Sequence, residues 1–209
     1  MFLRRISVCK GVRTSGENMK KSLLLALAMV SLCGCFTAGV RPRQYLLDAQ
    51  AVKPPQALPL VTMGRSAFPG GEIRLPRYLD SATPMMRVGK SQTSEVDERA
   101  RWASPLPDMM RDVLALNLIA MAAPEAEAVA SVDQLWFSRF APENRQALRV
   151  EGLARLSLTQ GGNTIVRFQF EQEWDGKSVE SLVFAYNQAL RQLALQLAQS
   201  VSQTPLSSH

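Results

Sequence analysis

The sequence contains very little of the two residue types that most often perform catalysis or bind metals. Its single histidine is the last residue, His209, and its three cysteines are Cys9, Cys33 and Cys35. A serine or cysteine nucleophile paired with histidine is excluded, because no histidine within the body of the chain could act as the base. A structural zinc site needs about four ligands, and beyond the closely spaced Cys33 and Cys35 the sequence offers only Cys9 and the terminal His209. We therefore expect no catalytic residue and no metal ligand.

Cysteines do occur in one informative place, the segment "LCGC" at residues 32–35, which ends an apolar run. Lys20 and Lys21 precede the run, and residues 23–30 are apolar throughout. A positive, then apolar, then small-residue order is the layout of a secretory signal. The segment therefore predicts export from the cytoplasm.

The end of this segment resembles the bacterial lipobox, with Leu32 at −3, Gly34 at −1 and Cys35 at +1. We predict a signal peptide over residues 1–34, with Met19 as a possible true start and cleavage between Gly34 and Cys35. In proteins with this motif the cysteine thiol takes a diacylglyceryl group and the new amine takes an acyl chain such as palmitate. These covalent lipids on Cys35 are the only non-protein groups we expect.

A transmembrane anchor is the main alternative, because Ser22 to Val40 carries no charge. A membrane span needs about 20 predominantly apolar residues, whereas the second half of this stretch contains serine, threonine, cysteine and two glycines. A redox role for Cys33 and Cys35 would need a folded scaffold around them. The lipoprotein signal is the interpretation that we favour.

Removal of residues 1–34 leaves 175 residues with 18 basic and 17 acidic side chains, so the quoted net charge of +6 belongs mostly to the leader. A nearly neutral chain gives no reason to expect a nucleic-acid partner. Only Cys35 remains, so no disulfide can form. We expect a lipidated tether at 35–43, one domain at 44–202 and a disordered tail at 203–209.

The acyl groups would decide where the domain works. Two or more acyl chains hold a protein stably on a membrane. In enterobacteria an aspartate after the lipidated cysteine retains lipoproteins at the inner membrane, and Phe36 occupies that position here. The predicted location is the periplasmic face of the outer membrane.

Residue patterns predict two helices and several strands. Ser104 is expected to cap a helix with Pro105 at its first position, and helical apolar spacing that includes Leu116 continues up to Pro124. Ser178 is expected to cap a second, longer helix with an apolar stripe from Val179 to Val201. The expected extended segments are residues 44–49, 57–63, 72–80, 84–96, 129–137, 147–158 and 164–174.

Two of these segments show an alternating pattern of apolar and polar residues. In 147–158 the even-numbered residues are apolar or glycine, and in 164–174 Val166, Phe168, Phe170 and Trp174 share one face. The glycine turn at 161–162 predicts an antiparallel hairpin with one solvent-exposed face. The predicted fold class is α+β, a single domain with a mostly antiparallel sheet and two main amphipathic helices packed on it.

Several residues could belong either to a site or to ordinary structure. Glu171 and Glu173 form a carboxylate pair, but on a strand they would share the solvent-exposed face. Trp102, Trp136 and Trp174 fit binding aromatics or core packing. We interpret all five as structural.

One stretch carries a more specific signal, "LPRYLDSATPMMRVGKSQTSEVDERARWASPLPDMMRDVLALNL" at residues 75–118. It resembles the signature region of the ABC-type transport auxiliary lipoproteins, and the similarity extends over most of residues 35–202. The matching positions are Leu75, Pro76, Tyr78, Leu79, Asp80, Arg87, Gly89, Glu98, Trp102, Ala103, Pro105 and Leu106.

The resemblance implies a role that composition does not reveal. Members of this family accompany MCE-domain intermembrane transport systems and support membrane integrity. The implied partners are the outer membrane, an MCE-domain protein, inner-membrane transporter subunits and a second copy of the chain. The implied contact or signature residues are Leu75, Pro76, Tyr78, Leu79, Asp80, Arg87 and Trp102. An assembly lipoprotein that handles no lipid, and an envelope enzyme with carboxylate chemistry, remain as alternatives.

Overall fold

A computed structural model describes residues 42–50, 53–64, 72–79, 86–88, 94–96, 100–143 and 146–203. The chain divides into a unit Met1–Val40 and a unit Arg41–His209, and every described residue belongs to the second. The predicted signal peptide, cleavage site and lipidation site therefore lie outside the described residues. So does nearly all of the predicted tail.

The predicted hairpin is present, formed by β8 (Ala147–Leu158) and β9 (Asn163–Glu173), which pair antiparallel, with β9 at one edge of the sheet. Gly161 and Gly162 turn the chain with φ of 98° and 89°, a region that favours glycine. The Leu158 N–H donates to the Gly162 carbonyl at 3.1 Å. The predicted alternation is confirmed, since the residues that face inward are less exposed than their neighbours on both strands.

The longest strand, β7 (Ala128–Pro142), runs five residues beyond the predicted 129–137 and pairs antiparallel with β8. Its pairing shifts register twice, between Val132 and Gln134 and between Phe137 and Arg139. Each shift inserts one extra residue, as in a β-bulge. The bulges bring Val132, Leu135, Phe137 and Phe140 to the same buried face although these residues do not alternate in the sequence.

The other edge of β7 carries two short strands in succession, β2 (Leu60–Met63) and β3 (Glu72–Arg74), and both run parallel to it. The five-stranded sheet is therefore mixed rather than purely antiparallel, although its two longest pairings, β7 with β8 and β8 with β9, are antiparallel, as expected of a mostly antiparallel sheet. Both strands are shorter than the predicted 57–63 and 72–80. The α+β fold class is confirmed.

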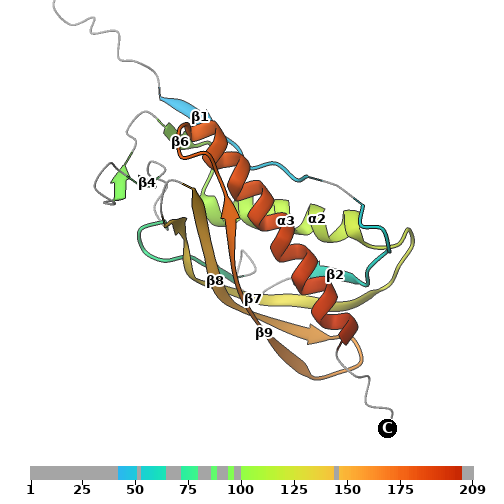
Figure 1. Cartoon of the computed structure of the whole chain (residues 1–209). Helices are drawn as coiled ribbons and strands as arrows, with labels where there is room; N and C mark the ends of the chain where they lie inside the picture. The colour runs from blue at the N-terminus through green and yellow to red at the C-terminus, as the bar shows by residue number, and fades with distance from the viewer. Residues whose placement is uncertain are drawn as a thin grey trace, which may run out of the picture. The chain divides into compact units, whose positions relative to one another are not determined.

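Two helices complete the second layer, α2 (Leu106–Met121) and α3 (Val179–Gln203). They contact each other, and α2 lies by β2 while α3 lies by β9 (Figure 1). The predicted Ser104 cap is wrong, because Pro105 occupies the cap position and makes no side-chain hydrogen bond. The Ser178 cap is confirmed, since its Oγ accepts from the Ser181 N–H at 3.0 Å. Neither helix is long and apolar enough to span a membrane.

Small strand pairs extend the fold at its N-terminal side. β1 (Arg43–Tyr45) pairs parallel with β6 (Ala100–Trp102), and β4 (Met86–Val88) pairs antiparallel with β5 (Ser94–Val96). β1 covers only the first part of the predicted strand 44–49. Instead of pairing in a sheet, the following residues lie along α3: the Asp48 N–H donates to the Asn187 Oδ1 at 3.0 Å.

The core lies between the helix layer and the inward face of the sheet. Tyr186 is its largest fully buried side chain and stands edge-on to Trp102 and Phe140, with ring centroids 5.6 and 4.6 Å away. Burial raises the pKa of the Tyr186 hydroxyl well above its usual range. Leu116, predicted to belong to the apolar stripe of α2, is instead 55% exposed.

Candidate functional site

The signature residues that the structure describes pack mainly as structural elements. Leu79 and Trp102 are buried, Leu75 packs against the core, and Pro76 is half-buried. Tyr78 is 41% exposed, but its hydroxyl accepts a hydrogen bond from the Phe140 N–H at 3.4 Å. The signature therefore ties the segment after β3 to β7 and closes the core near β6.

The remaining predicted site residues have no described side chain. Cys35, Gly34 and Asp80 lie outside the described residues, and Arg87 is described only as a strand position in β4. Their proposed roles in lipidation, cleavage and partner contact stay predictions.

The described part of the chain offers no obvious catalytic centre. It contains no group of three or more histidine, cysteine, aspartate or glutamate residues that could hold a metal ion. Glu171 and Glu173 lie on the solvent-exposed face of β9, as predicted. Glu171 lies 3.9 Å from Arg149. Arg149 also donates hydrogen bonds to Glu151 and Glu143, and these bonds raise the pKa of its guanidinium. These carboxylates belong to an ion-pair network on the outer face of the sheet.

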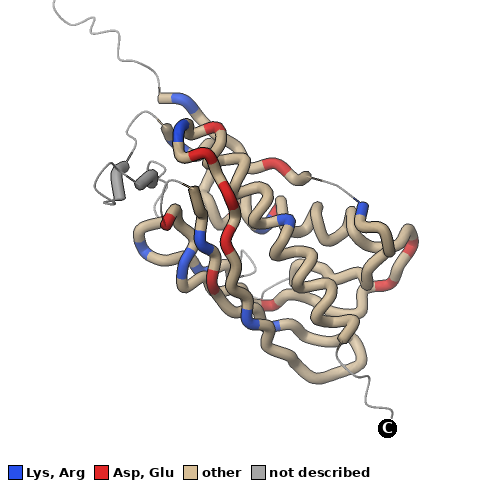
Figure 2. Tube along the Cα trace, viewed as in Figure 1, with Lys and Arg blue, Asp and Glu red and all other residues tan. Residues whose placement is uncertain are grey.

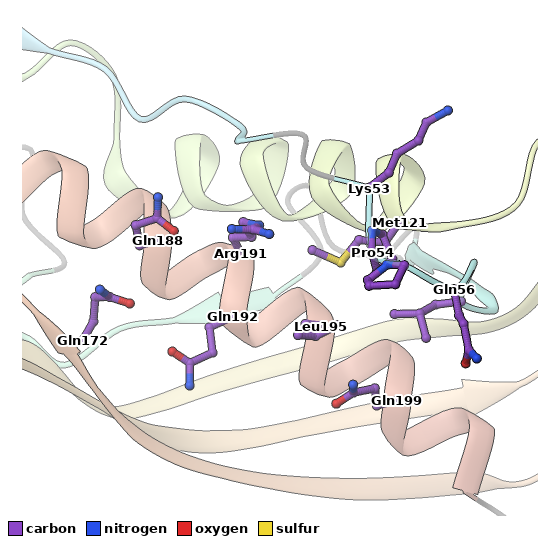
Figure 3. A pocket seen from close by; sticks show the side chains of 12 residues that line it. Lys53, Pro54, Gln56, Met121, Gln172, Gln188, Arg191, Gln192, Leu195 and Gln199 are labelled. Carbon is purple, nitrogen blue, oxygen red and sulfur yellow. The ribbon is translucent and has the colours of Figure 1, made fainter.

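A groove of about 780 Å³ runs along the side of α3 that carries Gln188, Gln192 and Gln199. This volume lies within the range of small-molecule sites in proteins, roughly 300–1,000 Å³. Five side chains at helical spacing on α3 line it, as Figure 3 shows. They are Gln188, Arg191, Gln192, Leu195 and Gln199.

The opposite wall of the groove comes from the segment that leads into β2. Lys53, Pro54, Pro55, Gln56 and Leu58 line it, together with Met121 at the end of α2 and Gln172 on β9. The Leu58 N–H donates a hydrogen bond to the Met121 carbonyl at 3.0 Å, which attaches this wall to the end of α2. Gln188 is tied to Gln50 through its side-chain amide. The wall is therefore positioned by backbone and amide hydrogen bonds.

The groove has an unusual charge balance. None of the described residues that line it is acidic, whereas Arg191 and Lys53 are basic. Over its 25 residues α3 carries only two charged side chains, Glu180 and Arg191, and Figure 2 shows the helix almost free of charge. Glu180 lies about 16 Å from Arg191 along the helix. Its carboxylate accepts a hydrogen bond from the Tyr45 hydroxyl at 2.9 Å and forms an ion pair with Arg43 at 3.6 Å.

Sequence reasoning missed this groove. The sequence does contain one indication of the groove, the composition of residues 181–203. An ordinary exposed helix carries charged residues of both signs on its polar face, whereas the polar positions here are mostly glutamines with one arginine. The wall from 53–58 could not be assigned, since it lies more than 120 residues away in the chain.

Comparisons with known proteins identify the fold and the family. The model of the ABC-type transport auxiliary lipoprotein component matches residues 45–198. The chain belongs to this family. The match spans every element from the end of β1 to the last turns of α3 and includes every residue that lines the groove except Gln199. No curated protein matches the sequence significantly.

Two crystal structures share the fold of this family member. One, described as an uncharacterized protein, has a TM-score of 0.55 and 17% identity, covering 77% of this chain and 99% of its own. The other is a protein from Xanthomonas campestris assigned to the DUF330 family model, with a TM-score of 0.54 and 18% identity, covering 77% and 95%. At this identity they establish the fold alone.

Proposed function

We propose that this protein is the outer-membrane-anchored periplasmic lipoprotein of an MCE-type intermembrane lipid transport system. The observation that carries the proposal is the family match over residues 45–198, which begins ten residues after the lipobox cysteine. In this proposal Cys35 holds the domain on the membrane, and the domain docks an MCE-domain protein that is joined to inner-membrane transporter subunits. The protein would support membrane integrity and would have no enzymatic activity.

The arrangement of the chain supports a short tether. β1 begins at Arg43, eight residues after Cys35, so the folded domain would sit within about 28 Å of the membrane even with the linker fully extended. A triacylated cysteine would make this attachment permanent. A transport component of this kind needs a fixed position and a contact surface, and it needs no catalytic side chains.

The anchor is tested by expressing the full-length chain with its own leader in a Gram-negative host and analysing the mature amino terminus by mass spectrometry. We expect a triacylated Cys35 in the outer-membrane fraction. The matched control is Cys35→Ser, which should lose both the acyl mass and the processing. An unmodified sulfur, or a retained leader in the wild-type chain, would contradict the proposal.

The partner is tested separately by affinity purification from detergent-solubilised envelopes. We expect an MCE-domain protein and its inner-membrane subunits to co-purify with the wild-type chain. Recovery of an outer-membrane assembly complex without an MCE-domain protein would favour the role of an assembly lipoprotein that handles no lipid.

A further inference from the structure

The groove along α3 contains an arginine with an unsatisfied donor. The Nε atom of Arg191 is buried and has no hydrogen-bond partner among the described residues. No ion pair within the described residues includes this side chain. A buried donor on a charged group is costly when it is left unpaired. Because the guanidinium of Arg191 lines the groove without an anionic partner among the described residues, a group in the groove that brings negative charge and acceptor oxygens would pair with it.

The surroundings of Arg191 select a particular kind of anion. The polar side chains nearest to it along α3, Gln188 and Gln192, are amides that can donate to an oxygen without repelling it. Arginine holds phosphate and carboxylate oxygens through two parallel N–H groups. Because none of the described lining residues carries a carboxylate, an anion would meet no acidic side chain among them.

The groove becomes apolar beyond Arg191. Leu195 lies one turn further along α3, about 6 Å away, and Leu58, Met121 and the prolines 54 and 55 face the same space. An acidic head held at Arg191 would thus leave its apolar tail beside these side chains. A free inorganic anion would use only the polar end.

We propose that the α3 groove binds a glycerophospholipid, with its phosphodiester on Arg191 and an acyl chain along Leu195, Leu58 and Met121. This inference deepens the proposed transport function and rests on it for the biological role of the lipid. It would make the protein a lipid acceptor as well as a docking component.

The test is photo-crosslinking of the full-length chain in intact cells of a Gram-negative host. A benzophenone amino acid is introduced at Leu195, or at Gln199 as a second groove position if the first variant folds poorly. The control position is Ile165, which is 64% exposed on β9 and does not line the groove. The purified protein is then analysed by mass spectrometry for a phospholipid adduct.

We expect the adduct at the groove positions and at most a trace at Ile165. Arg191→Gln should lower the yield at Leu195 about tenfold, as expected for the loss of a charge-assisted hydrogen bond, and Arg191→Lys should retain part of it. Equal adducts at all positions, or an adduct unaffected by Arg191→Gln, would overturn the proposal. So would no lipid adduct together with thermal stabilisation of the chain by inorganic phosphate, which would show a site for a free anion.

This outcome is independent of the tests of the proposed function. A lipid adduct could form although no MCE-domain protein co-purifies, and a partner could co-purify although the groove stays empty of lipid. Each failure therefore identifies which of the two proposals is wrong.

Discussion

Replacement of Gly152 by alanine tests the packing at the centre of the sheet. A Cβ atom placed on Gly152 would lie 2.1 Å from the Trp136 carbonyl oxygen and 2.5 Å from Cζ of Phe168. The carbonyl belongs to β7, which is paired with β8 at this level, so it has little freedom to move. The Phe168 ring is buried and packs edge-on against Phe137 at 5.4 Å, which limits its retreat.

The size of the effect follows from these contacts. Overpacking of a well-packed core costs about 1–3 kcal/mol, and here one of the two clashes is with backbone. We therefore expect Gly152→Ala to lower the free energy of unfolding by about 3 kcal/mol. For a domain of this size that corresponds to a decrease in Tm of about 6–12 °C.

The assay is thermal and urea denaturation of the full-length chain, followed by circular dichroism. The matched control is Gly162→Ala, where no heavy atom lies within 4 Å but φ is 89°. Backbone strain alone predicts a cost of about 1 kcal/mol there. Combining Gly152→Ala with Phe168→Leu should recover part of the lost stability, because the smaller side chain vacates the space.

Two results would refute this reasoning. One is a Tm for Gly152→Ala that falls no further than that of Gly162→Ala. The other is a double variant with Phe168→Leu whose loss equals the sum of the two single losses, since additivity would mean that the side chains do not compete for the same space.

Three further predictions concern single side chains. Trp102→Ala should destabilise the domain by about 3–5 kcal/mol, measured by urea denaturation, because the ring is buried against Tyr186; a loss below about 1 kcal/mol would contradict its structural role. Asn117 is fully buried, and neither of its amide atoms has a hydrogen-bond partner among the described residues; Asn117→Leu should therefore raise stability by about 1–2 kcal/mol, and a decrease would indicate a further polar partner. Hydrogen bonds, first from Ser181, lower the pKa of Asp175 from its ordinary 3.8, so this carboxylate supports the helix cap above that pH and loses its effect as pH falls through the lowered value. Ser181→Ala should return this pKa toward 3.8 in an NMR titration, and an unchanged pKa would show that backbone donors suffice.

Some features of the site depend on contacts between segments that are far apart in the sequence. The walls of the groove come from residues 53–58 and 188–199, and no local pattern states that these segments lie together. The same applies to β2 and β3, whose parallel pairing with β7 joins residues more than 60 positions apart. Sequence analysis therefore predicted these strands but gave them the wrong lengths and did not predict their orientation.

Local sequence patterns determined those elements of the fold that depend only on residues close together in the sequence. Alternation of apolar residues predicted β8 and β9, helical spacing predicted α2 and α3, and the glycine pair predicted the turn between the strands, because each depends on neighbours within a few residues. The lipobox prediction is of the same local kind. Tertiary structure alone decided the bulges that keep the buried apolar residues of β7 inward, the packing of Trp102 against Tyr186 of α3, and the position of Arg191 in a groove whose described lining residues include no acidic side chain. These features depend on which segments pack together, and the period of a sequence does not encode that choice.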